Sequence, residues 1–210
     1  MSGRSSRPGG KSHRLRTQLR FRCAERRDIP ALLRLIHAAY REVGEGSGWT
    51  TEAHLLGGPR IERAELEALI DSSGSRMILA EPAELRERDA ALEDPPEPIG
   101  CCHTALTNDG EASLGLLAVC PDTQSRGVGR ALVTEVEQVA LRLWDARSIV
   151  MRVIAQRDDI IAWYERLGYR RTEERLPFPY RPGAGAKRDD LEFAVLRKTL
   201  DASETKPSRS

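Results

Sequence analysis

A glycine-containing turn between an apolar run and an amphipathic stretch is the feature that most constrains how this chain folds. Residues 114–119 are apolar, and the run stops at Pro121, which predicts a short buried strand. From Val128 onward, apolar residues recur at helical spacing, so a helix follows the strand. Residues 121–132, with the sequence PDTQSRGVGRAL, are therefore expected to carry the chain from a strand into a helix.

The start of this helix has the chemistry of a phosphate site. The backbone N–H groups of residues 125–130 have no intrahelical partners, and the helix dipole places partial positive charge there. Gly127 and Gly129 carry no side chain, so a ligand can approach the backbone closely. Arg126 and Arg130 add full positive charges. The loop is therefore predicted to bind phosphate.

Two common nucleotide loops do not fit this stretch. A Walker loop ends in Gly-Lys-Ser/Thr, and residues 121–132 contain no lysine. A dinucleotide fingerprint needs three spaced glycines, whereas only Gly127 and Gly129 are present here. A glycine-bearing turn without a ligand is the alternative that the loop alone leaves open.

Composition predicts one soluble domain. The chain has 210 residues, and 33 basic side chains nearly balance 32 acidic ones, so neither nucleic-acid nor membrane binding is expected. The four cysteines show neither metal-type pairing nor a disulfide framework, which favours buried thiols, no metal site and a cytoplasmic location. Residues 1–18 and 201–210 are predicted to be disordered tails of a domain that spans residues 19–200.

A second signature lies at residues 159–169, with the sequence DIIAWYERLGY. Ile160, Trp163 or Tyr164, and Leu167 fall on one face of a predicted helix. Gly168 is placed as its C-terminal cap, and Tyr169 opens the next predicted strand.

These two blocks together resemble the GNAT N-acetyltransferase superfamily, over about residues 19–199. The first block is Gln124-x-x-Gly127-x-Gly129 after a strand, and the second is the helix-glycine-aromatic-strand order of residues 159–169. The resemblance implies an α/β fold with a mixed, mostly antiparallel sheet of about seven strands, about four helices and a splayed central strand pair. It also implies that acetyl-CoA is the cosubstrate and that an amine is the acetyl acceptor.

The resemblance assigns roles to individual positions. The backbones of Leu117 and Val119 would pair with the pantetheine arm, and Tyr164 would protonate the coenzyme A thiolate. A core aromatic is the alternative reading of Tyr164. Many relatives have asparagine where this chain has Arg157, so the role of that asparagine does not transfer. The cofactor would be bound by Gln124, Ser125, Arg126, Gly127, Val128, Gly129 and Arg130, with the N–H groups of the last four on its pyrophosphate.

The acceptor and the base that deprotonates it are less constrained. A lysine-like amine is almost entirely protonated at pH 7, and forming its neutral, nucleophilic state costs roughly 4.6 kcal/mol. A base or desolvation must therefore remove the proton. By residue type the candidates are Glu52, His54, His103 and Glu111. The irregular segments at residues 49–56 and 178–190 are predicted to select the acceptor, through Trp49, Glu52, Phe178, Tyr180, Asp189 and Asp190.

Several alternatives stay open at this point. The acceptor is a small-molecule, peptide or protein amine, and a homodimer is compatible with the sequence. A non-catalytic acyl-CoA sensor of the same fold is one alternative function. A nucleotide-binding or interaction module that uses the Gly127 loop for another phosphate is a second.

Overall fold

The computed structural model describes residues 18–41, 50–83, 97–180 and 185–201. Trp49 and most of both predicted tails lie outside these residues. The elements include four α-helices: α1 (Ile29–Arg41), α2 (Arg63–Asp71), α4 (Val128–Trp144) and α5 (Asp158–Glu165). The strands are β1 (Leu19–Cys23), β2 (Ser75–Pro82), β3 (Gly100–Leu106), β4 (Ala112–Val119), β5 (Ser148–Ile154), β6 (Arg170–Pro177) and β7 (Glu192–Thr199), and two short 3-10 helices are η1 (Arg26–Asp28) and η3 (Pro121–Thr123).

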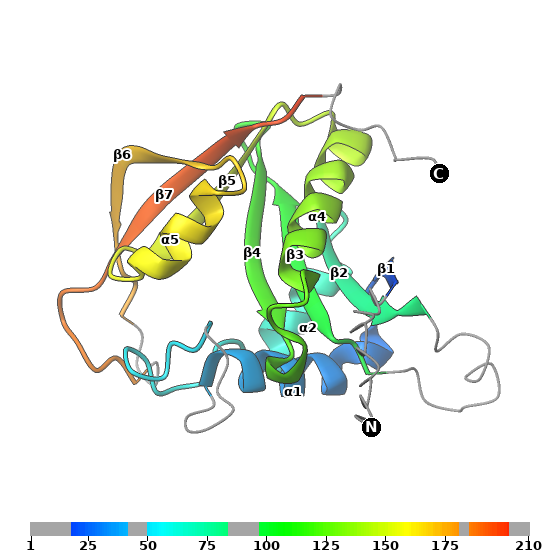
Figure 1. Cartoon of the computed structure of the whole chain (residues 1–210), viewed down its shortest axis with the longest axis horizontal. Coiled ribbons are helices and arrows are strands. Elements are labelled where there is room, and N and C mark those ends of the chain that lie inside the picture. Colours follow the sequence, from blue (N-terminus) through cyan, green and yellow to red (C-terminus); the bar gives the residue numbers. More distant parts are fainter. Residues whose placement is uncertain (1–17, 42–49, 84–96, 181–184, 202–210) are drawn as a thin grey trace, which may run out of the picture.

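The described strands form one sheet in the order β1-β2-β3-β4-β5-β7-β6 (Figure 1). Neighbouring strands are antiparallel except β4 and β5, which run parallel. The predicted mixed, mostly antiparallel α/β fold with about seven strands and four helices is confirmed.

The central strand pair splays, as predicted. β4 and β5 pair only over Ala112–Leu114 and Ile149–Met151, and beyond these residues they diverge (Figure 1). A bulge in β4 bends the strand at this point, because Leu116 and Leu117 both lie opposite Cys102. Leu116 also has a positive φ of 45°, which is unusual for a residue other than glycine.

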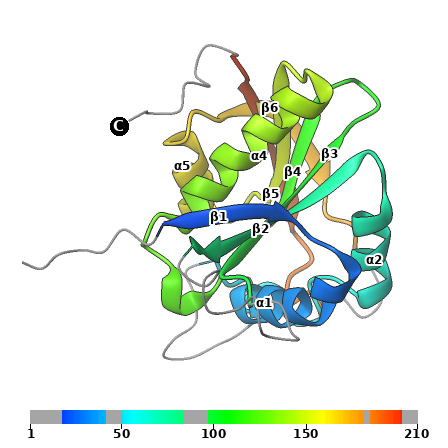
Figure 2. The same cartoon turned by 90° about the vertical axis from the view of Figure 1, so that its right-hand side faces the viewer.

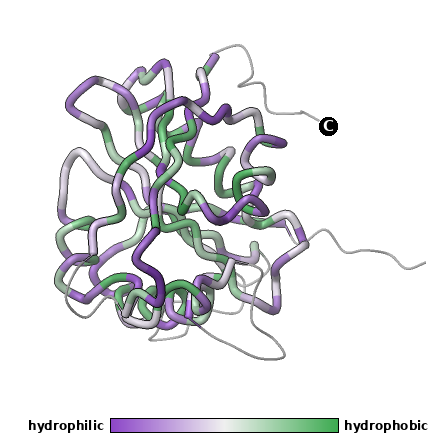
Figure 3. Tube along the Cα trace, turned by 90° about the vertical axis from the view of Figure 1, so that its left-hand side faces the viewer, coloured by the Kyte–Doolittle hydropathy of each residue, from purple (hydrophilic) through white to green (hydrophobic). Residues whose placement is uncertain are grey.

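Each face of the sheet is covered by helices, so the interior has two layers (Figure 2). One core lies between the sheet and α4 and α5, and the other lies between the sheet and α1 and α2. Cys102 belongs to the first core and Cys101 to the second, as the alternation of a strand requires. Hydrophobic segments of the chain gather between these layers (Figure 3). All four cysteines are free thiols.

Two local contacts define the ends of elements. The Asp28 carboxylate accepts from the Glu25 N–H at 2.8 Å and so closes the 3-10 turn η1, after which α1 begins at Ile29. Leu176 and Pro177 end β6, where they pair with Phe193 and Glu192. Proline is tolerated there because β6 is the edge strand and Pro177 ends it.

None of the helices in the described part of the chain is both long and apolar enough to cross a membrane.

Candidate active site

The loop between β4 and α4 presents a row of backbone donors. The first bond of α4 runs from the Ala131 N–H to the Gly127 carbonyl at 3.0 Å. Within the described chain, the N–H groups of residues 125–130 donate to no protein acceptor. Ser125 and Gly127 have positive φ values of 64° and 88°, which turn the chain into the helix. Six donors at a helix N-terminus fit the charge and geometry of a pyrophosphate.

Two arginines add charge to this loop. Arg126 and Arg130 are exposed, and neither forms an ion pair with any described residue. Their guanidinium groups are therefore available to an anion that approaches the loop.

Gln124 does not extend toward solvent in front of the loop. Its side-chain amide donates to the Val119 carbonyl at 3.1 Å and lies 3.3 Å from the Thr50 Oγ1. It therefore links the end of β4 to the segment that follows α1. This geometry suits a residue that positions the loop, rather than one that contacts phosphate itself.

The edge of β4 that faces the split is partly occupied by side chains. The Tyr40 hydroxyl donates to the Leu117 carbonyl at 2.8 Å, and Gln124 donates to the Val119 carbonyl. In a strand, the N–H and the C=O of one residue point to the same side. The N–H groups of Leu117 and Val119 therefore also face the split. These N–H groups are what this edge offers to the predicted pantetheine arm.

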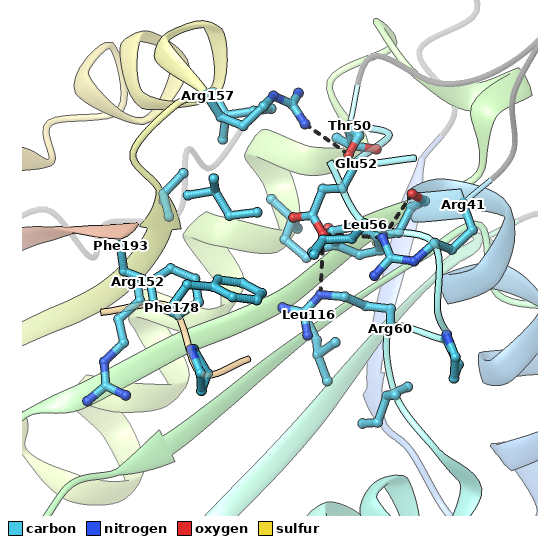
Figure 4. A pocket seen from close by; sticks show the side chains of 18 of the residues that line it. Arg41, Thr50, Glu52, Leu56, Arg60, Leu116, Arg152, Arg157, Phe178 and Phe193 are labelled. Atoms are coloured by element: carbon cyan, nitrogen blue, oxygen red, sulfur yellow. Dashed lines mark hydrogen bonds and ion pairs between the residues drawn. The ribbon is translucent and has the colours of Figure 1, made fainter. Parts of the chain in front are cut away.

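A cavity of about 750 Å³ opens where β4 and β5 separate (Figure 4). It extends from the split to α1 and α2 on one side and to β7 on the other. Its walls are formed by Tyr40, Arg41, Thr50, Glu52, Leu56, Pro59, Arg60, Ile61, Glu62, Glu65, Ala68, Leu69, Leu116, Leu117, Arg152, Val153, Ile154, Arg157, Ile160, Trp163, Tyr164, Phe178, Pro179 and Phe193.

Trp163 connects this cavity to the glycine loop. Its indole lines the cavity and also lies against the first turn of α4, since a Cβ atom on Gly129 would stand 3.6 Å from its ring. The ring also packs edge-on against Tyr164, with centroids 4.8 Å apart. A ligand held at residues 125–130 can thus extend past Trp163 into the cavity.

Tyr164 is both a core residue and a wall of the cavity. It is 6% exposed and packs edge-on against Trp163 and Tyr169. Burial raises the pKa of its phenol well above the ordinary value, so the hydroxyl keeps its proton at neutral pH. The two readings of this residue are therefore compatible, because the ring packs in the core while the residue borders the cavity.

Of the four candidate bases, the structure brings only Glu52 to the cavity. Its carboxylate lies 3.3 Å from Arg41 and 3.9 Å from Arg60. His54 is exposed and does not line the cavity. His103 contacts Ser75 at 2.7 Å, and burial lowers its pKa to about 4, so it is a neutral core residue. Glu111 directly precedes β4, at the end far from the cavity, where its carboxylate accepts from Ser148 and Arg197.

Arg157 has a structural role in this chain. Its guanidinium is nearly buried, pairs with Asp159 at 2.9 Å and donates to the Thr51 carbonyl at 2.8 Å. It therefore ties the start of α5 to the segment at residues 50–51. Arg157 also lines the cavity, so the position at which many relatives have asparagine borders the cavity in this chain.

The two predicted acceptor segments lie together. Leu56 pairs with Ala186, and the Lys187 N–H donates to the Leu55 carbonyl at 2.9 Å. From these segments the cavity receives Thr50, Glu52, Leu56, Phe178 and Pro179. Tyr180, Asp189 and Asp190 do not reach it; Asp190 pairs instead with Arg188. Six further cavity residues belong to no local motif and so carry no signal in the sequence: Tyr40, Arg41, Arg60, Glu62, Glu65 and Arg152.

Comparison with known proteins identifies the fold family. The family model described as acetyltransferase (GNAT) family matches residues 60–169, just over half of the chain. No curated protein matches. The fold is similar to that of the ribosomal-protein-S18-alanine N-acetyltransferase from Escherichia coli, with a TM-score of 0.61 at 16% identity, covering 90% of this chain and 99% of that one.

It is also similar to spermidine N-acetyltransferase from Vibrio cholerae, solved in complex with CoA and spermine. That likeness has a TM-score of 0.60 at 17% identity and covers 87% of this chain and 96% of the other. The matched residues 60–169 contain the glycine loop, the open edge of β4 and Tyr164. The chain belongs to the GNAT family of acetyltransferases and is an acyltransferase.

Proposed function

We propose that this protein is an acetyl-CoA-dependent N-acetyltransferase that moves the acetyl group to a primary amine by direct attack. One observation carries the proposal. The open edge of β4 and Tyr164 border a single cavity, which Trp163 joins to the donor-rich glycine loop. Both structural neighbours named above are N-acetyltransferases, which supports an amine acceptor.

The cosubstrate would be held by the groups described above. The N–H groups of residues 125–130, with Arg126 and Arg130, would bind its pyrophosphate, and the N–H groups of Leu117 and Val119 would pair with its pantetheine arm. When bound, acetyl-CoA supplies the thioester whose carbonyl carbon the amine attacks.

Tyr164 would then act as the general acid. The new C–N bond forms as the amine nitrogen attacks, and the C–S bond breaks as the phenol gives its proton to the departing sulfur. A phenol with a raised pKa holds its proton at neutral pH, so the hydroxyl carries the proton that the departing sulfur needs. The proton that the amine loses passes to water or to Glu52, the candidate base in the cavity.

The proposal is tested by measuring thiol release from acetyl-CoA in the presence of amines, amino acids, polyamines and peptides. We expect at least one amine class to accelerate thiol release and to give an N-acetyl product by mass spectrometry. A protein that binds coenzyme A but acetylates none of them would be the acyl-CoA sensor instead. Competition of ATP or NAD with coenzyme A would favour the nucleotide-binding module.

Phe178→Ala is expected to raise KM for the amine about tenfold while leaving KM for acetyl-CoA unchanged. Phe178 lines the cavity near Phe193, away from the glycine loop, and its truncation removes apolar contact area worth about 1–2 kcal/mol from the acceptor. Asp189→Ala is the control, because Asp189 lies in the same predicted segment but does not reach the cavity. A change confined to the acetyl-CoA KM would contradict this assignment of Phe178.

A further inference from the structure

The charged side chains that line the cavity show which acceptors it suits. Seven of the lining residues carry charge: Arg41, Arg60, Arg152, Arg157, Glu52, Glu62 and Glu65. Most of these charges are already compensated within the protein. A charged side chain of the cavity lining that has no partner within the protein is available to a ligand.

The acidic groups of the cavity are engaged. Glu52 lies between Arg41 and Arg60, at 3.3 and 3.9 Å. Glu62 and Glu65 form the capping box at the start of α2. The Glu62 carboxylate accepts from the Glu65 N–H, and the Glu65 carboxylate accepts from the Glu62 N–H at 3.1 Å. The helix dipole compensates negative charge at that position. The four arginines of the lining outnumber its three glutamates, so the cavity has a net positive charge, which does not favour a polycation.

Among the basic groups, Arg152 differs from the others. Arg157 pairs with Asp159, Arg41 pairs with Glu52, and Arg60 adds a contact with the Tyr40 ring, 5.2 Å from its centroid. The Arg152 side chain is exposed, and its guanidinium has no hydrogen bond or ion pair with any described residue.

The position of Arg152 in β5 directs it to the acceptor side. It follows Met151, the last residue of β5 that pairs with β4. Met151 faces the core beneath α4, so Arg152, its neighbour in the strand, faces the opposite side of the sheet. Figure 4 shows Arg152 with Phe178 and Phe193 at one side of the cavity, and Arg41 and Arg60 at the other; the guanidinium of Arg152 extends away from the other labelled side chains. A cation on an exposed side chain thus stands at the rim of the cavity, on the side of its apolar wall.

We propose that the acceptor is a primary amine that also carries an anionic group, and that Arg152 binds that group. A planar guanidinium forms two parallel hydrogen bonds with a carboxylate, and a phosphate can take the same place. Phe178 and Phe193 would accommodate an apolar part of the same molecule. This inference rests on the proposed function, and it distinguishes this cavity from one built for polyamines.

The test uses acceptors that differ only in the anionic group. We expect kcat/KM for phenylalanine and for 6-aminohexanoate to exceed that of the corresponding primary amides, and that of spermidine, by about 10–100-fold. Aminoalkylphosphonates of matched length show whether a phosphate serves as well as a carboxylate. Arg152→Gln should remove the preference for the anion and leave the rate with the amides within about threefold.

Arg171→Gln is the matched control. It makes the same change of charge on β6, at an exposed residue that does not line the cavity, and it should keep the preference. A binding measurement makes the test independent of turnover. Calorimetry should detect 3-phenylpropanoate but not 3-phenylpropanamide binding to the wild-type protein with coenzyme A, and Arg152→Gln should lose that binding.

The outcomes separate the two proposals. Equal rates with acids and amides, a preference for spermidine, or an Arg152→Gln variant that slows both substrates equally would overturn the anion inference and leave N-acetyl transfer standing. Arg152-dependent binding of 3-phenylpropanoate without turnover of any amine would support the anion site and overturn the proposed function. Absence of carboxylate binding in calorimetry would overturn the anion site directly.

Discussion

Tyr164→Phe is expected to lower kcat by about 10²–10⁴-fold, which corresponds to roughly 3–5 kcal/mol in the activation barrier. The substitution keeps the buried ring and its edge-on contacts with Trp163 and Tyr169, and it removes only the hydroxyl. The variant should therefore fold and bind acetyl-CoA nearly as well as the wild type. The measurement is single-turnover acetyl transfer, so that product release does not mask the chemical step.

Tyr169→Phe is the matched control for this prediction. Tyr169 is also a buried tyrosine of the same core, but its hydroxyl donates to Glu137 at 2.9 Å and it does not line the cavity. Loss of the Tyr169 hydroxyl should lower the free energy of unfolding and leave kcat nearly unchanged. Because burial raises the pKa of Tyr164 well above 10, its ionisation should also cause no fall in kcat up to about pH 10. If Tyr164→Phe stays within about threefold of wild type while chemistry limits the rate, Tyr164 is a core aromatic only.

Gly129→Glu is expected to weaken coenzyme A binding by about 100-fold or more from a Kd in the micromolar range. The new carboxylate would stand at the first turn of α4, where we propose that the pyrophosphate binds, and two like charges so placed cost several kcal/mol. Calorimetry with coenzyme A measures the effect, and circular dichroism checks that the variant is folded.

Two further substitutions separate charge from volume at this position. A Cβ atom on Gly129 would meet Trp163 and Val119 at 3.6–3.7 Å, which is ordinary van der Waals contact. Gly129→Ala should therefore be well tolerated. Gly129→Gln has the size of the glutamate without its charge and should bind more tightly than Gly129→Glu. Unchanged affinity in a folded Gly129→Glu variant would show that the phosphates bind elsewhere.

The parts of the fold that sequence reasoning predicted are those set by local patterns. The apolar run before Pro121 and the helical spacing after Val128 gave the β4-to-α4 turn, because burial and periodicity act within a few residues. The splayed strand pair was predicted only through the resemblance. Gly115 directly precedes the bulge at Leu116, but an isolated glycine in a strand is equally compatible with a close backbone approach, so it did not predict the splay by itself.

The parts of the site that could not be predicted depend on distant residues. Gln124 meets Thr50, 74 positions away, and Arg157 meets Thr51, 106 positions away, so neither contact leaves a pattern in its own segment. Residue type alone made His103 a candidate base, yet burial in β3 keeps it neutral and away from the cavity. Arg152 interrupts an apolar strand, and that interruption was the one available sign that this face of β5 borders solvent.

The open edge of β4 also bears on whether a strand of another molecule can pair with it. An exposed strand edge with unpaired donors and acceptors is a template on which a strand of another molecule can form. Here the Leu117 and Val119 carbonyls are already taken by Tyr40 and Gln124, so an incoming strand would find donors but no matching acceptors. To pair with this edge, an intruding strand needs N–H donors and C=O acceptors in alternation. A ligand that binds through its carbonyl oxygens needs only the N–H donors. The same two side chains that shape the split therefore make this edge a poor nucleus for aggregation.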